Sequence, residues 1–164
     1  MPEAPTPTLA LRTAMEARNV QAVVETFAPD ADFHSPFTSK LTFHGREQIG
    51  RLTRVVLDVF EDFHYVDEAR SGDSAFLVAL TRVGGAELEL VDHLRLGPGG
   101  AIDDCTVFMR PLPAATVALR LIGAGLARHR STARGALVST LARPLGFMTR
   151  AGDGLGVALI KPSV

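Results

Sequence analysis

The chain has 164 residues, of which 46% are hydrophobic and 21% are charged, a balance that is typical of one domain with a real core and excludes disordered, collagenous and coiled-coil proteins. Its net charge of −1 hides an uneven distribution: residues 1–110 hold 17 acidic and 10 basic side chains (−7), whereas residues 111–164 hold one acidic and seven basic side chains (+6). The asymmetry predicts that residues 111–164 form an appended segment with contacts of its own.

The single cysteine, Cys105, cannot form an internal disulfide, and no apolar run follows a basic stretch at the start of the chain. These features favour a cytoplasmic protein. Residues 1–8 are rich in proline and polar side chains, and we expect them to be disordered. Because Arg120 interrupts the longest apolar stretch, we expect no membrane-spanning helix.

Helical patterns come first along the chain. Apolar residues return at helical spacing from Thr8 to Phe27, and Asn19 makes a break between two short helices. Short extended pieces at Asp32–Ser35 and Leu41–His44 precede a third amphipathic helix at Gly45–Phe60.

From Asp62 onward the hydrophobic period becomes two, and glycine-containing turns separate four extended runs that end at Arg110. Helices followed by a strand meander predict an α+β fold in which the helices cover one face of a curved antiparallel sheet. Beyond Pro111, the sequence predicts helical pieces at Ala114–Arg130 and Ala133–Arg143.

Three segments, VETFAPDADFHSP, FHGREQIG and VDHLRLGPGGAI, together resemble the nuclear transport factor 2-like superfamily, especially its ketosteroid isomerase and SnoaL-like branches. The resemblance covers residues 9–110. It implies a cone-shaped α+β fold, in which a bent antiparallel sheet wraps over three N-terminal helices around an apolar pocket. Residues 111–164 are then a basic, apolar C-terminal helical extension.

Asp92 is the leading candidate for a catalytic residue. In the alternating run Glu87–Leu96 it shares the phase of the leucines, so it points into the apolar side. A desolvated carboxyl group has a raised pKa, and its protonated form donates a hydrogen bond to a developing oxyanion. Similarity to ketosteroid isomerase places Asp92 at that family's oxyanion-hole acid. The alternative is a buried carboxyl group satisfied by a backbone N–H or an arginine.

Other catalytic groups implied by the resemblance are missing. The general base of ketosteroid isomerase falls at Ser35, and its second oxyanion donor falls at Leu11. The last-strand carboxylate of SnoaL-like cyclases and limonene epoxide hydrolases falls at Val107, and the arginine of those hydrolases falls at Leu90. Because an unactivated serine is no base near neutral pH, binding alone or a different chemistry is expected.

His34 is the remaining candidate for a catalytic base, since imidazole suits proton transfer near neutral pH. Strand alternation, however, puts His34 on the face opposite Phe33 and Ser35, so a surface or interface histidine is the alternative.

Asp103 is a third catalytic candidate. It shares a strand phase with Cys105, Val107 and Met109, and if that phase faces the cavity, Asp103 and Cys105 join Asp92 as its polar lining. One cysteine and five scattered histidines give no metal-ligand spacing, so we expect neither a metal nor another cofactor.

These residues predict an internal pocket for a small apolar molecule such as a steroid, terpene, polyketide or lipid, with Asp92 as the polar anchor. Its predicted lining is Leu11, Phe33, Ser35, Phe63, Leu88, Leu90, Leu94, Cys105, Val107 and Met109. If catalytic, the protein is a cofactor-independent isomerase, cyclase or hydratase. The alternative is a non-catalytic dimerisation or assembly module whose basic C-terminal segment contacts a partner or a membrane surface.

Charge and sheet geometry also bear on partners. Residues 1–110 would repel phosphates, so nucleic acid is not expected. We expect a homodimer formed through the outer sheet face. Three arrangements stay open for the C-terminal segment: packing against the acidic domain or its dimer partner, a peripheral membrane contact through residues 114–150, and a lid over the mouth of the cone.

Overall fold

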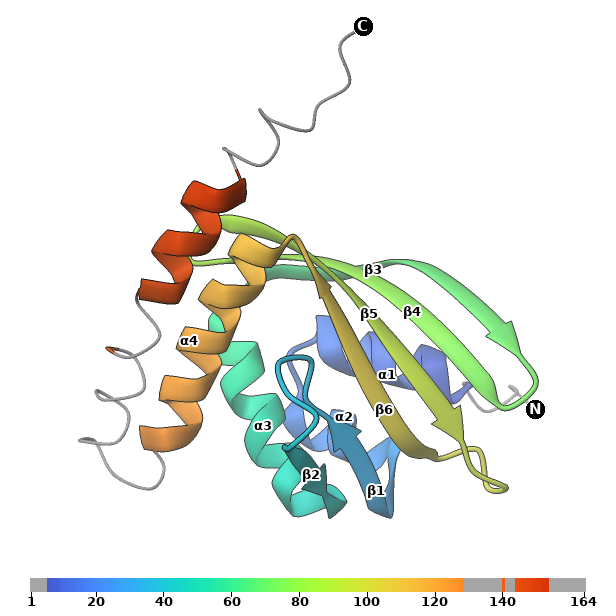
Figure 1. The fold of residues 1–164 in the computed structure, drawn as a ribbon. Coiled ribbons are helices and arrows are strands. Elements are labelled where there is room, and N and C mark those ends of the chain that lie inside the picture. Colours follow the sequence, from blue (N-terminus) through green and yellow to red (C-terminus); the bar gives the residue numbers. More distant parts are fainter. Residues whose placement is uncertain (1–5, 129–139, 141–143, 154–164) are drawn as a thin grey trace, which may run out of the picture.

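The computed structural model describes residues 6–128, 140 and 144–153 (Figure 1). In chain order the elements are α1 (Pro7–Glu16), α2 (Val20–Glu25), β1 (Phe27–His34), β2 (Thr42–His44), α3 (Gly45–Val59), β3 (Phe60–Ser71), β4 (Ser74–Val83), β5 (Ala86–Leu96), β6 (Ile102–Arg110) and α4 (Leu112–Arg128). Residues 144–153 are helical and are called the C-terminal helix below. The helix predicted at Ala133–Arg143 lies outside the described residues, except for residue 140.

Side-chain caps determine where the first two helices begin. The Thr6 hydroxyl accepts the N–H of Leu9 (3.3 Å) ahead of α1, and the Asn19 amide oxygen accepts the N–H of Ala22 (3.1 Å) ahead of α2. Asn19 therefore separates the two helices, as its sequence position predicts. The cap at Thr6 also draws Pro7 and Thr8 into α1, so the helix begins one residue before the helical pattern predicted from Thr8.

One six-stranded sheet runs in the order β2-β1-β6-β5-β4-β3. Neighbouring strands are antiparallel except β1 and β6, which are parallel and are joined by a long connection that contains β2, α3 and strands β3 to β5. Strand β1 also starts earlier than predicted, at Phe27, and an irregularity between Phe27 and Asp32 accommodates Pro29. The α+β fold class is confirmed, with this one parallel pair added to the predicted antiparallel sheet.

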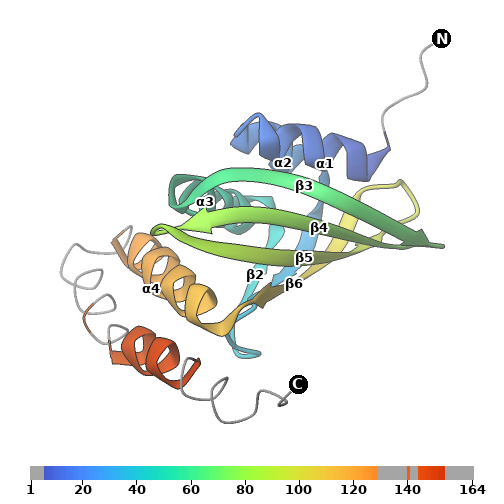
Figure 2. The same cartoon turned by 90° about the horizontal axis from the view of Figure 1, so that it is seen from above.

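The helices lie within the curve of the sheet (Figures 1 and 2), which encloses the core between the two layers. Its most deeply buried side chains come from α3 and from the inward phases of β4, β5 and β6; they include Ile49, Leu77, Leu88, Leu94 and Ile102. Buried and exposed residues alternate along β4 and β5, and this alternation is the reason why the sequence pattern predicted these strands.

Helix α4 packs into the same core beside α3. Its residues Ala114, Val117, Ala118 and Ile122 are buried. Gly125 allows the close approach of the two helices, because a Cβ atom there would lie 2.5 Å from a methyl carbon of Val55. Within the described ranges, no helix is long and apolar enough to cross a membrane.

Candidate functional site

A pocket of about 150 Å³ that is partly open to solvent lies between the concave face of the sheet and the helices, and it is called the inner cavity below. Its walls come from α1, α2, α3, α4, all strands except β4, and the loop 35–41. They comprise Leu11, Met15, Val23, Phe27, Phe33, Ser35, Pro36, Phe37, Thr38, Leu41, Phe43, Leu52, Thr53, Val56, Phe60, Phe63, Tyr65, Leu90, Asp92, Cys105, Val107, Met109, Leu119, Ile122, Gly123 and Leu126. Hydrocarbon and aromatic side chains therefore dominate the lining.

Aromatic rings pack against one another in this wall. The rings of Phe60 and Phe63 are stacked with centroids 6.2 Å apart, and the ring of Phe63 meets that of Tyr65 edge-on at 5.0 Å. Phe33 and Phe43 make a second edge-on pair at 6.3 Å. Such pairs hold the ring planes in fixed orientations, so the wall has a defined shape.

One buried polar pair faces this apolar space. The Tyr65 hydroxyl donates a hydrogen bond of 2.7 Å to Oδ2 of Asp92, and both side chains line the inner cavity. Every fully buried side-chain nitrogen or oxygen of the described residues has a hydrogen-bond partner, whereas Oδ1 of Asp92 makes no such bond. Oδ1 is therefore not fully buried, and its accessible surface faces the inner cavity.

Tyr65 reaches Asp92 across an intervening strand. Tyr65 on β3 pairs with Ala79 on β4, and Asp92 on β5 pairs with Leu77 of the same β4. Strands lie about 4.8 Å apart, so the tyrosine ring must extend over β4 to meet a residue two strands away. The methyl side chain of Ala79, which is fully buried, leaves the ring room to do so.

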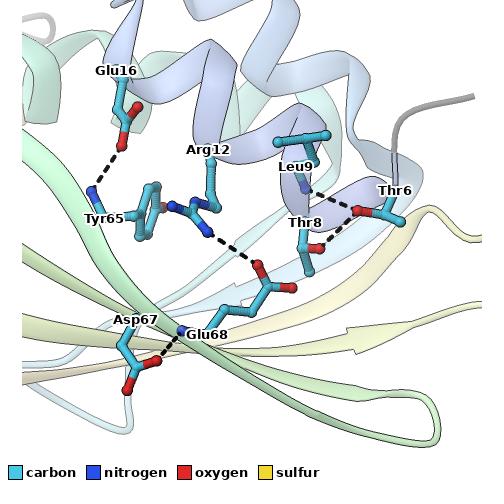
Figure 3. A network of polar contacts seen from close by, with 8 residues as sticks. All are labelled: Thr6, Thr8, Leu9, Arg12, Glu16, Tyr65, Asp67 and Glu68. Atoms are coloured by element: carbon cyan, nitrogen blue, oxygen red, sulfur yellow. Dashed lines mark hydrogen bonds and ion pairs between the residues drawn. The ribbon is translucent and has the colours of Figure 1, made fainter.

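Helix α1 holds the Tyr65 backbone in place (Figure 3). The N–H of Tyr65 donates to a carboxylate oxygen of Glu16 at 2.9 Å, and the guanidinium of Arg12 lies 3.4 Å from a carboxylate oxygen of Glu68. These contacts tie both ends of one stretch of β3 to α1, so the tyrosine enters the inner cavity from a fixed position.

Burial changes the acid–base properties of the three titratable groups in the cavity. Desolvation raises the pKa of Asp92 from 3.8 to about 6, although the hydrogen bond from Tyr65 opposes part of the rise. Desolvation, followed by the nearby Asp92 charge, raises the pKa of Tyr65 well above its ordinary value. The same two causes raise the pKa of the Cys105 thiol, which stays protonated and is a poor nucleophile. Asp92 is thus the cavity group that exchanges a proton near neutral pH.

Residues 9–110 match the family model of the SnoaL-like domain. The chain belongs to the SnoaL-like family. This result confirms the resemblance seen in three short segments of the sequence. The chain has no match among curated proteins.

Several solved structures share the fold of this SnoaL-like domain. A steroid delta-isomerase from Pseudomonas aeruginosa is 27% identical, with a TM-score of 0.65 over 80% of this chain and 96% of the other. A bacterial protein with a cystatin-like fold from Silicibacter pomeroyi is 24% identical, with a TM-score of 0.68 over 80% and 90%. An epoxide hydrolase/cyclase-like enzyme of pyran ring formation in the polyether salinomycin is 18% identical, with a TM-score of 0.55 over 63% and 88%.

The structure brings most of the predicted lining of this SnoaL-like protein together. Leu88 and Leu94 differ: they flank Leu90 and Asp92 on the inward phase of β5, but their side chains are packed into solid core and do not border the inner cavity. The predicted residues that do border the cavity are Leu11, Phe33, Ser35, Phe63, Leu90, Asp92, Cys105, Val107 and Met109.

Asp103 lies outside the cavity. The register of β5 and β6 shifts at this point, because Arg95 pairs with Asp104 whereas the next residue, Leu96, pairs with Ile102. Asp103 is the extra residue of this bulge, and its side chain is exposed beside Gly97. Simple alternation placed it with Cys105, and the bulge removes it from that phase.

His34 also lies outside the inner cavity, on the opposite face of β1. Its Nε2 is 2.7 Å from Oδ2 of Asp104, and its Nδ1 is 3.3 Å from the hydroxyl of Thr42. The imidazole is therefore engaged by neighbouring strands, in keeping with the surface alternative. Among the described residues, no group of three or more histidine, cysteine or carboxylate side chains is placed to hold a metal ion.

Sequence reasoning missed two parts of the site. It gave Tyr65 no role, although Tyr65 shares the strand phase of Phe63 and is the only tyrosine of the chain. It also took no lining residue from α4, which contributes Leu119, Ile122, Gly123 and Leu126. The family resemblance ends at Arg110, so it carried no information on this wall.

Proposed function

We propose that this SnoaL-like protein binds a small, mostly apolar molecule in the inner cavity, and that the Asp92–Tyr65 pair recognises an oxygen atom on it. The observation that carries the proposal is the 2.7 Å hydrogen bond between these two side chains in a predominantly apolar wall. A buried polar pair in such a wall fixes the orientation of a ligand, whereas the apolar surroundings supply most of its affinity.

The volume of the cavity narrows the ligand class. A cavity of about 150 Å³ lined mainly by aliphatic and aromatic side chains admits a benzene-sized molecule. A single-ring terpenoid or aromatic compound with one carbonyl or hydroxyl group therefore fits the cavity better than the four fused rings of a steroid, and aromatic contacts from Phe33 and Phe63 favour a flat ring.

Proton transfer is the chemistry available to the pair. With a pKa of about 6, Asp92 passes between its charged and neutral forms near neutral pH, and its Oδ1 is open to the cavity. One carboxylate that takes a proton from one carbon and returns it to another is sufficient for an isomerisation, in which substrate and product hold the same atoms. The 27% identity to a steroid delta-isomerase supports this class, whereas Ser35 and Leu11 depart from the ketosteroid isomerase pattern.

A thermal-shift screen with single-ring phenols, cyclic monoterpenoid ketones, steroids and fatty acids tests the binding proposal. A ligand at about 100 times its Kd adds roughly 2.7 kcal/mol to the free energy of unfolding, so Tm rises by several degrees. We expect single-ring oxygenated compounds to give the largest shifts. Asp92→Asn and Tyr65→Phe reduce the shift for these compounds but not for their hydrocarbon analogues.

Asp103→Asn is the matched control, since it removes a carboxylate of the same sheet that lies outside the cavity. The proposal fails if no compound stabilises the wild type, or if Asp92→Asn leaves every shift unchanged.

The outer sheet face favours a second role, the pairing of two copies of the chain. Phe76, Leu80 and Phe108 are 39%, 39% and 57% exposed there, and Phe108 continues an apolar cross-strand row with Val91 and Val78. A twofold axis would place this face against itself, so its apolar centre would be covered in both copies.

A further inference from the structure

The C-terminal helix forms an outer layer on α4. The two helices lie side by side and run in opposite directions in both views (Figures 1 and 2). The hydroxyl oxygens of Thr116 and Thr149 are 3.1 Å apart, and a Cβ atom on Gly146 would lie 3.8 Å from the Thr116 hydroxyl. The face of the C-terminal helix that meets the protein is therefore the one that carries Gly146 and Thr149.

The opposite face of this helix is apolar and open to solvent. Helical spacing places Phe147, Met148 and Ala151 together, away from Gly146 and Thr149. Phe147 is 76% exposed and Met148 is 67% exposed, and Leu145 beside them is 44% exposed. A surface helix ordinarily buries its apolar face and exposes its polar one. Here the arrangement is reversed, which marks the surface as one that a partner covers.

The charge around this apolar face is positive. None of Arg120, Arg128 and Arg150 forms an ion pair with a described residue, although residues 1–110 carry an excess of seven acidic side chains. Arg120 lies one helical turn after Thr116, on the side of α4 that faces the C-terminal helix, and Arg150 lies on that helix itself. Asp153 on the C-terminal helix offsets one of these three arginines, so the described residues of 111–164 carry a net charge of +2.

We propose that this apolar, basic layer docks on an anionic lipid surface. An exposed apolar stripe with arginines on the same helix and on its neighbour suits a helix that lies in the plane of a membrane interface, where the stripe enters the acyl boundary and the cations meet the headgroups. A second copy of the chain is a poorer occupant. A twofold contact would bring the arginines of two copies together, and their repulsion opposes association.

Tryptophan fluorescence on the full chain tests the docking directly. The chain has no tryptophan, so Phe147→Trp introduces a single tryptophan, which lies in the apolar stripe. We expect its emission to shift to the blue when vesicles of phosphatidylcholine mixed with phosphatidylserine are added, and to stay unchanged with phosphatidylcholine alone. Added salt should reverse the shift, because the headgroup contribution is electrostatic. Phe108→Trp, on the exposed outer sheet face, is the matched control and should not respond.

Vesicle flotation of the wild type and of the Phe147→Ser, Met148→Ser double variant gives the second measurement. We expect the double variant to lose about tenfold or more of the affinity for anionic vesicles, because two large apolar side chains no longer enter the interface. Unchanged circular dichroism establishes that it folds.

Three outcomes overturn the proposal: no binding of the wild type to anionic vesicles, equal binding by the double variant, or self-association without lipid that the double variant abolishes. The last outcome would assign the layer to a second copy of the chain.

Discussion

The SnoaL-like domain and the helix that follows it contribute differently to one cavity. Every polar side chain of the lining, including Asp92 and Tyr65, comes from residues 9–110, whereas α4 supplies only hydrocarbon and glycine surface. The family-matched part therefore supplies the polar groups of the lining, and the appended helix closes one side of the cavity. Two proteins that share the domain but differ in this helix can hold the same polar pair in cavities of different size.

The two regions also differ in net charge, but this difference does not determine how they pack. Residues 1–110 and 111–164 have opposite net charges, which predicts mutual attraction, yet no arginine of α4 pairs with a described acidic residue. Contact between the regions is made by apolar side chains such as Val117 and Ile122 and by the close approach at Gly125. Exposed ion pairs contribute little, so burial decides how α4 packs.

Removal of residues 112–164 is the most severe way to separate the two regions. The deletion uncovers the inner cavity and the part of the core that α4 covers. It also removes the buried side chains of Val117, Ile122 and four alanines. We expect the free energy of unfolding to fall by more than about 5 kcal/mol, enough to prevent stable folding. Urea unfolding followed by circular dichroism measures this loss.

A shorter deletion, of residues 141–164, keeps α4 and serves as the control. Its effect on stability should be much smaller. If the longer deletion left the urea midpoint unchanged, α4 would not be part of the core.

The pH dependence of the free energy of unfolding tests the polar group that residues 9–110 contribute to the cavity, Asp92. Folding raises the pKa of Asp92 from 3.8 to about 6, so the folded state binds the proton more tightly than the unfolded state. Its contribution to stability is therefore greatest in acid and is lost as the pH rises from about 4 to about 6. Each pH unit in this window is worth about 1.4 kcal/mol, so the loss is about 3 kcal/mol.

Asp92→Asn removes this titration. The difference in the free energy of unfolding between wild type and variant, measured by urea titration at several pH values, should change by that amount across the window and stay constant above it. A difference that is constant at every pH would mean that the pKa of Asp92 is not raised.

Phe108→Asp is the mildest change for the fold. Phe108 lies on the outer sheet face and is 57% exposed, so the free energy of unfolding of a single chain should change by no more than about 0.5 kcal/mol. If two copies pair through this face, sedimentation should show a dimer for the wild type and a monomer for the variant. Asp103→Asn is a suitable control, and a dimer that survives Phe108→Asp would place the contact elsewhere.

Local periodicity predicted most of the fold and part of the site. Asp92 was identified because the leucines around it define an inward phase, and the same logic placed Cys105, Val107 and Met109 in the wall. It failed at Asp103, since one extra residue in β6 changes the phase without any signal in composition.

Tyr65 and α4 needed information that neighbouring residues do not carry. The partner of Tyr65 lies 27 residues further along the chain, and their contact depends on the register of three strands and on a small side chain between them. The packing of α4 depends on the shape of a core that other elements build. Both are long-range properties of the folded chain.

The position of Tyr65 has a practical consequence. The chain contains one tyrosine and no tryptophan, and that tyrosine donates a hydrogen bond to the Asp92 carboxyl group in the wall of the inner cavity. The tyrosine band of the near-ultraviolet spectrum therefore comes from a single side chain at the candidate site. The wild-type protein carries its own optical label there, so ligand entry and the protonation of Asp92 are open to direct spectroscopic titration without any added dye.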